Sequence, residues 1–229
     1  MATFALVSEG ITDQLILQHI IYAVVEDDHD EEVHFSILQP LRDATDQSRQ
    51  EPESFGGWEK VLEYCTKTNE LIEALSVNQY LVIQIDTDLC EHPNFGLSLH
   101  DNGRELTPLE LALTTKNKLI ELMTWEFYDA HKDRIIFAIT VHSSECWLLP
   151  FYGTTASARC KTKSCESTLN RDLTKQDIKY AKDGPCYEKI CKPLSKAKLL
   201  KRARKLNGNL DDFVESIESL APYDYDIHK

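Results

Sequence analysis

The sequence contains no apolar run long enough for a membrane span. No stretch approaches the roughly 18 uncharged apolar residues that a spanning helix needs. The start, Met1-Ala2-Thr3-Phe4, lacks the basic end and the small-residue cleavage site of a signal peptide. There is no internal repeat, no low-complexity tract and no Walker-type phosphate loop. We therefore expect no membrane partner, no ATPase site and a cytoplasmic location.

A disulfide framework is also not expected. The seven cysteines are an odd number and are scattered through the chain, so they are typical of reduced thiols in a cytoplasm. Two pairs, Cys160/Cys165 and Cys186/Cys191, invite comparison with zinc sites. Four residues separate the members of each pair, whereas zinc ribbons and knuckles usually have two. We expect structural or partly buried free thiols rather than zinc ligands.

Basic residues are scarce in most of the chain. The formal net charge is −13, which by itself argues against a nucleic-acid partner. The distribution is uneven, because residues 1–158 carry a net charge of −18 and residues 159–205 carry +10. An acidic body is therefore followed by a basic segment.

Hydrophobic residues make up 42% of the 229 residues, enough for a sizeable core. Strand-like and helix-like patterns alternate as far as residue 141, and this order favours an α/β fold. We expect a mainly parallel sheet of about four strands flanked by helices, with a basic α-helical C-terminal extension. The predicted division is a catalytic domain over 1–152 and the extension, packed on it, over 153–229. The predicted elements are strands at 3–8, 33–38, 80–85 and 134–141, helices at 11–25, 58–75 and 108–130, and a helical region at 193–220.

Acidic residues stand at the ends of two of these strands. Residues 3–7 lead into Glu9, and residues 80–85 lead into Asp86 and Asp88. The carboxyl ends of parallel strands meet at the edge where open α/β sheets bind ligands. Carboxylates that converge there repel one another unless a cation neutralises them. The pattern therefore predicts a site for a hard divalent cation, Mg²⁺ or Mn²⁺.

The same residues resemble the Toprim domain. Residues 7–13, Val-Ser-Glu-Gly-Ile-Thr-Asp, look like the Glu-Gly-x-Thr-Glu/Asp entry of OLD-type nucleases and their small stand-alone relatives. Gly56-Gly57-Trp58 and the Ser-x-Glu-x-Trp pattern at residues 143–147 are similar to features of those relatives. The resemblance covers roughly residues 3–152. Because OLD-type enzymes also carry an ATPase domain, it implies that any ATPase partner is a separate protein.

The resemblance implies two metal ions. Glu9, Asp86 and Asp88 would form one site, and Asp13 with Glu145 would form the second. Glu9, Asp86, Asp88 and Glu145 would be the catalytic residues. Two metals about 3.5–4 Å apart would neutralise the phosphate, activate water and stabilise the leaving oxygen. The alternative interpretation makes Asp13 a first-turn acid favoured by the helix dipole and Glu145 a solvated carboxylate.

Other polar side chains lie near this pattern in the sequence. Ser143 is a candidate hydroxyl ligand. His142 follows the fourth strand and either lies near the metals or packs at the strand end. Lys161 and Lys163 are candidates for the cation that OLD-type enzymes use in the transition state.

The basic segment at residues 192–205 has seven cationic residues and no acid. An apolar stripe would dock this helix and turn its cations towards phosphates. The alternative is a solvated helix face that balances an acidic neighbour. The predicted phosphate contacts are Lys198, Lys201, Arg202, Arg204 and Lys205.

These features predict a Mg²⁺- or Mn²⁺-dependent endonuclease that cleaves DNA or RNA. The resemblance further implies an effector of antiphage defence that works with a separate ABC/OLD-type ATPase and can form a homo-oligomer. The main alternative is a non-hydrolytic module on the same fold that binds nucleic acid or an ATPase as a regulator or toxin. A primase-like polymerase and a small-molecule phosphatase are weaker alternatives.

Overall fold

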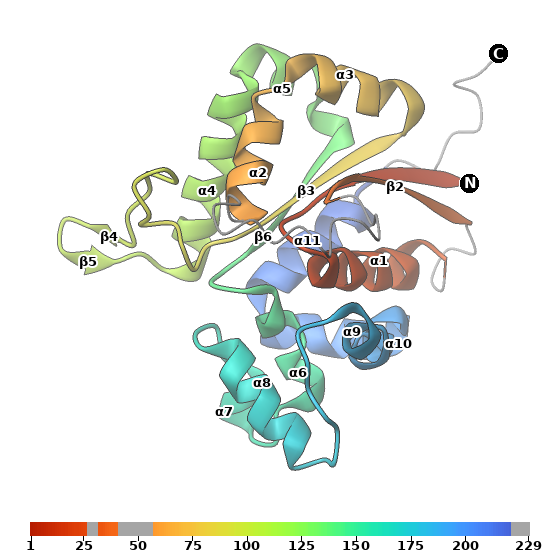
Figure 1. Ribbon diagram of the computed structural model, residues 1–229, viewed down its shortest axis with the longest axis vertical. Helices are drawn as coiled ribbons and strands as arrows, with labels where there is room; N and C mark the ends of the chain where they lie inside the picture. Colours follow the sequence, from red (N-terminus) through yellow and green to blue (C-terminus); the bar gives the residue numbers. More distant parts are fainter. Residues whose placement is uncertain (27–31, 41–56, 221–229) are drawn as a thin grey trace.

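The computed structural model describes residues 1–26, 32–40 and 57–220. Strands and helices alternate in the first half of the chain, and short helices fill the second half (Figure 1). The elements up to the third strand are β1 (Ala2–Val7), α1 (Ile11–Val25), β2 (Val33–Gln39), α2 (Gly57–Cys65), α3 (Thr68–Val77) and β3 (Tyr80–Asp86). The next are β4 (His100–Asp101), β5 (Arg104–Glu105), α4 (Pro108–Met123), α5 (Trp125–His131), η2 (Lys132–Arg134) and β6 (Ile135–Thr140). The remainder are η3 (Ser144–Trp147), α6 (Leu149–Tyr152), α7 (Ala156–Arg159), α8 (Cys165–Thr174), α9 (Gly184–Ile190), η4 (Lys192–Ser195), α10 (Ala197–Ala203), η5 (Arg204–Leu206) and α11 (Gly208–Glu218).

The main sheet has four strands in the order β2-β1-β3-β6, and every neighbouring pair is parallel. The two central strands are almost uninterrupted runs of apolar residues, because helices cover both faces of the sheet. This arrangement confirms the predicted α/β class and the predicted parallel sheet. It also brings the carboxyl ends of β1, β3 and β6 together at one edge.

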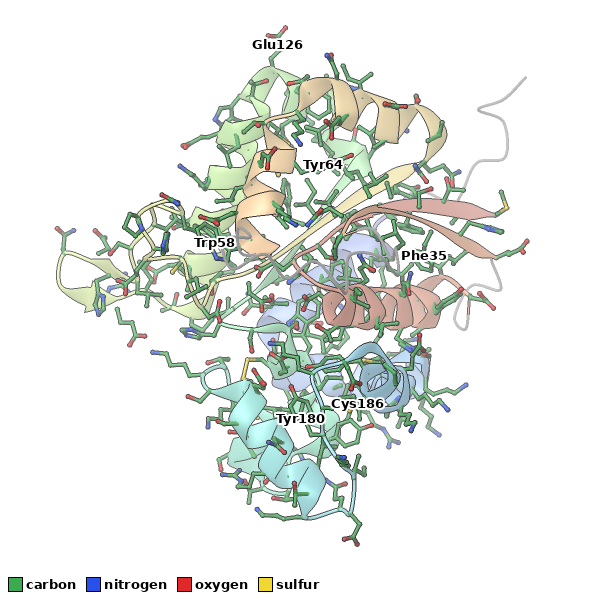
Figure 2. The ribbon with its side chains drawn as sticks, in the orientation of Figure 1. Phe35, Trp58, Tyr64, Glu126, Tyr180 and Cys186 are labelled. Carbon is green, nitrogen blue, oxygen red and sulfur yellow. A yellow bond between two sulfur atoms is a disulfide. The ribbon has the colours of Figure 1, made fainter. Side chains whose placement is uncertain are left out.

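Successive residues of β1 point into two separate cores. Phe4 and Leu6 pack with α1 and with helices that follow β6. Ala5 and Val7 pack with α2, α3 and α4 on the other face. Figure 2 shows the same division, with Trp58 of α2 on one side of the sheet and Tyr180 on the other.

Two predicted helices are each broken into two. The helix predicted over 58–75 is α2 and α3, with residues 66–67 between them, and Gly56 lies outside the described residues. The helix predicted over 108–130 is interrupted at Thr124, which has a positive φ of 72°. A left-handed residue cannot continue an α-helix, and the Thr124 hydroxyl instead accepts the Phe127 N–H that starts α5.

The C-terminal helices complete the core on the α1 face. Leu194, Leu200, Leu210 and Phe213 are at most 2% exposed and belong to the same hydrophobic cluster as α1. The helical region predicted for 193–220 is divided into η4, α10, η5 and α11. The boundary between 1–152 and 153–229 stays a prediction. None of the described helices is both long and apolar enough to cross a membrane.

Candidate acidic site at the carboxyl edge of the sheet

The ends of β1 and β3 are joined through their acidic residues. The Asp86 N–H donates a 2.6 Å hydrogen bond to Glu9 Oε1. Gln84, on β3, connects the same two residues. Its Oε1 accepts the Glu9 N–H at 3.1 Å, and its Nε2 donates to Asp86 Oδ1 at 2.9 Å. Gln84 is 1% exposed. One buried amide therefore sets the position of both strand ends.

Strand β6 and the turn after it orient the Asp86 carboxylate and the backbone of Asp88 at the end of β3. The Thr140 hydroxyl donates to Asp86 Oδ1. The Asp88 N–H donates to the His142 carbonyl at 3.0 Å, which holds the turn after β3 against the turn after β6. The side chain of Asp88 lies exposed at the rim.

Asp13 and Glu145 lie behind this rim and are 7% and 1% exposed. Asp13 Oδ1 accepts a 2.5 Å hydrogen bond from the Ser144 hydroxyl. Glu145 Oε1 accepts from the Tyr187 hydroxyl at 2.7 Å and lies 3.3 Å from Lys182 Nζ. Glu145 Oε2 is buried and has no hydrogen-bond partner among the residues that the structure describes. Such an atom is rare in a folded protein, because an unpaired buried carboxylate oxygen loses its hydration without compensation.

The pKa shifts show that these carboxylates share one electrostatic environment. Burial, followed by the charge of Asp13, raises the pKa of Glu9 to about 8. Burial also raises the pKa of Asp13 to about 6, although the Ser144 hydrogen bond opposes this shift. Burial and the charges of Asp13 and Glu9 raise the pKa of Asp86 well above its usual value. Glu145 differs, because Lys182 and Tyr187 outweigh its burial and hold its pKa below the usual value.

A close backbone contact fixes Glu9 from the α2 side. A Cβ atom at Gly57 would lie 2.4 Å from the Glu9 carbonyl oxygen. Only glycine allows the start of α2 to approach the end of β1 so closely. This contact gives a physical reason for the glycine at that place in the sequence.

The carboxylates of the site suit a hard divalent cation, since carboxylate oxygens are the ligands that Mg²⁺ and Mn²⁺ prefer. The unpartnered Glu145 Oε2 is the observation that supports this fit. Within the described ranges, however, no three His, Cys, Asp or Glu side chains are already arranged to hold an ion. Several of their oxygens are instead engaged by Thr140, Gln84, Ser144 and Tyr187.

The lysine next to the carboxylates is Lys182, which the sequence did not single out. Its ammonium pairs with Glu145 at 3.3 Å and with Glu166 at 3.4 Å. The two lysines suggested by the sequence are engaged elsewhere: Lys161 donates to the Thr168 hydroxyl at 2.7 Å, and Lys163 pairs with Glu105. Lys182 lies in an irregular segment between α8 and α9, so no periodic pattern could have identified it.

His142 and Ser143 lie at the mouth of the site and line a cavity beside Asp88. Burial, followed by the charge of Lys163, lowers the pKa of His142, so its ring is mostly neutral at pH 7. The Ser144 hydroxyl contacts the acidic cluster through Asp13, and Ser143 helps to lower the pKa of Glu145. Ser143 therefore stays a candidate ligand, and Ser144 is a second hydroxyl that the sequence analysis did not single out.

The prediction that all cysteines are reduced thiols is wrong for one pair. Cys146 and Cys165 form a disulfide, visible as a yellow bond near the start of α8 in Figure 2. The bond ties the turn that carries Glu145 to the first residue of α8. The other five cysteines are free, including Cys186 and Cys191, for which free thiols were expected.

The predicted phosphate-binding residues lie on α10 and η5, and four of the five are exposed. Lys198 and Arg202 are on α10, and Lys205 is on η5. Lys201 is also exposed, and its side chain or backbone contacts another group of the protein. Arg204 is different. It is 12% exposed and its guanidinium pairs with Asp211, Glu215 and Glu218, so it links η5 to α11 and is not available to a phosphate.

Comparison with protein-family models, with characterised proteins and with solved structures finds no match to this chain. The resemblance to the Toprim domain therefore stays a prediction from the residues, and the arguments that follow depend on the geometry of the site.

Proposed function

We propose that this protein is a Mg²⁺- or Mn²⁺-dependent nuclease of the Toprim type that cleaves nucleic-acid phosphodiesters. The supporting observation is the gathering of Glu9, Asp13, Asp86, Asp88 and Glu145 at the carboxyl edge of the sheet, linked by the mutual effects on their pKa values. Burying several carboxylates together is unfavourable in a metal-free protein. A cation site is the function that gives such an arrangement a physical reason.

Each residue has a distinct task in this proposal. Glu9, Asp86 and Asp88 would hold one ion, and Asp13 and Glu145 would hold the second. The ions would supply charge neutralisation at the phosphate and an activated water. Gln84 positions Glu9 and Asp86, and Tyr187 positions Glu145. The ammonium of Lys182 would stabilise negative charge that develops on the phosphate.

The wider role follows from the resemblance and is part of the proposal. The protein would act in the cytoplasm as an effector of antiphage defence with a separate ATPase, and it could act as a homo-oligomer. The exposed cations of α10 and η5 would contact the nucleic-acid backbone.

One observation favours the alternative of a non-hydrolytic regulatory or toxin module on the same fold. Asp86 and Asp13 are already hydrogen-bonded by Thr140, Gln84 and Ser144. A cluster that is stabilised internally could serve as a structural centre while another surface binds nucleic acid or an ATPase.

A cleavage assay separates the two functions. Purified protein is incubated with plasmid DNA, single-stranded DNA and total RNA, with and without Mn²⁺. We expect Mn²⁺-dependent cleavage that the double variant Asp86→Ala/Asp88→Ala abolishes. The matched control is Asp101→Ala, which removes an exposed acid on β4. Full activity in the double variant would exclude the proposed site. Cleavage only after addition of a partner ATPase would identify a latent effector.

A further inference from the structure

A cavity of about 520 Å³ opens directly beside the acidic site. Asp88, His142 and Ser143, which follow β3 and β6, line one part of it, and residues at the beginning of α8 line another part, which we call the α8 wall. Lys182 also lines the cavity. Figure 1 shows α8 in the group of helices below the sheet, apart from the helices that cover its two faces. We term this space the α8 cavity.

The α8 wall is polar but mostly uncharged. It carries Ser164, Ser167 and the amide of Asn170, together with the carboxylate of Glu166. These hydroxyl and amide groups can both donate and accept hydrogen bonds. A sugar hydroxyl or the edge of a base is a suitable partner for them.

The charges of the cavity do not favour a phosphate inside it. Two carboxylates, Asp88 and Glu166, face the single ammonium of Lys182, and that ammonium is already paired with Glu145 and Glu166. The anionic part of a bound nucleotide is better placed at the neighbouring site. The uncharged part, sugar and base, is the part that suits the cavity.

We propose that the α8 cavity binds the sugar and base of one unpaired nucleotide, next to the phosphate that the acidic site holds. This inference rests on the proposed nuclease function and adds the substrate class, a single strand or a locally opened duplex. The volume lies in the range of about 300–1,000 Å³ that is usual for small-molecule sites. A base inside a duplex is stacked and paired, so it must leave the helix to enter such a cavity.

Binding tests this proposal separately from cleavage. A fluorescein-labelled single strand and its duplex are titrated with Ca²⁺ in place of Mn²⁺, and fluorescence anisotropy gives the dissociation constants. We expect the single strand to bind about tenfold more tightly than the duplex. Ser167→Trp and Asn170→Trp, which fill the cavity, should weaken single-strand binding about tenfold and leave Mn²⁺ affinity unchanged. Thr174→Trp, an exposed position on the same helix outside the cavity, is the matched control.

Equal affinity for the two substrates, or unchanged single-strand binding in both cavity-filling variants, would overturn the proposal. If the tryptophan variants fail to fold, the wild-type protein provides the test through a strand that contains photoactivatable 4-thiothymidine. The expected crosslink lies within residues 164–170, and a crosslink confined to α10 would overturn the proposal. Tight single-strand binding without any Mn²⁺-dependent cleavage would count against the nuclease and leave the cavity assignment standing.

Discussion

The backbone N–H of Asp86 donates a hydrogen bond to the carboxylate of Glu9, across the boundary between β3 and β1. This bond favours the ionised form of Glu9, yet burial and the charge of Asp13 outweigh it and raise the pKa of Glu9 to about 8. The folded protein therefore binds a proton at Glu9 more tightly than the unfolded chain does.

The raised pKa of Glu9 predicts a pH-dependent stability of the metal-free protein. The stability that the folded protein gains from protonated Glu9 is fully present below the usual pKa of 4.5. It disappears as the pH rises through about 8. In EDTA, raising the pH from 5 to 8 should lower the Tm of the wild type more than it lowers the Tm of Glu9→Gln. The difference should be on the order of 5 °C. Thermal melts across this range measure the difference, and parallel curves for the two proteins would contradict the prediction. The Gln side chain keeps an oxygen that can accept the Asp86 N–H.

Lys182 should affect turnover more than substrate binding. In the proposed nuclease, Lys182→Met should lower kcat about 100-fold, because the variant would lack a positive charge beside the reacting phosphate, with a small change in KM. It should also shift the acidic limb of the pH–rate profile upwards, since Lys182 lowers the pKa of Glu145. Lys179→Met removes an exposed lysine from the same segment and serves as the control. Failure of Lys182→Arg to restore any turnover would contradict the electrostatic role, because the variant keeps the positive charge.

Reduction of the Cys146–Cys165 disulfide should lower the free energy of unfolding. The bond closes a loop between residues separated by 19 positions, for which chain entropy predicts about 3 kcal/mol. Thiol titration of the unfolded protein should give five free thiols before reduction and seven after it. Cys165→Ser should melt at the temperature of the reduced wild type, whereas Cys160→Ser, at an exposed free cysteine, should melt as the oxidised wild type does. Seven titratable thiols without a reductant would show that the bond does not form.

The exposed cations of α10 and η5 should act on binding without altering chemistry. If Lys198, Arg202 and Lys205 bind phosphates, the triple glutamine variant should bind nucleic acid more weakly. The slope of its salt dependence should be shallower by roughly 0.7–0.9 for each phosphate that the variant no longer neutralises. Equal slopes for variant and wild type would make this surface a solvated helix face. Arg204→Gln is the informative comparison, because it should destabilise the protein by removing the pairs with Asp211 and Glu218 and leave the salt slope unchanged.

The sequence predicts the sheet and the acidic edge because both depend on short-range patterns. Runs such as Tyr80 to Ile85 are typical of buried strands between two helical layers, and the residue after such a strand lies at its carboxyl end. Glu9 and Asp86 could therefore be placed near each other although 77 positions separate them.

The partners of Glu145 could not be predicted in this way. Tyr187 contacts it from 42 positions away, and Lys182 lies in a segment without helical or strand periodicity. Their positions depend on how the helices after β6 fold back onto α1, which is a matter of tertiary packing. The same packing brings Cys146 to Cys165, a pairing that an odd count and irregular spacing of cysteines could not reveal. The break at Thr124 was missed because the apolar pattern continues through it.

The late positions of Lys182 and Tyr187 in the chain determine when the acidic edge can form during synthesis. When a nascent chain has emerged from the ribosome only as far as β6 and the turn after it, all five carboxylates are present but the ammonium and the hydroxyl that compensate Glu145 are still inside the exit tunnel. The acidic edge can take its final form only after α9 has emerged. A product terminated before residue 182 would carry the whole sheet with an uncompensated cluster, so premature termination in this region should yield a destabilised polypeptide.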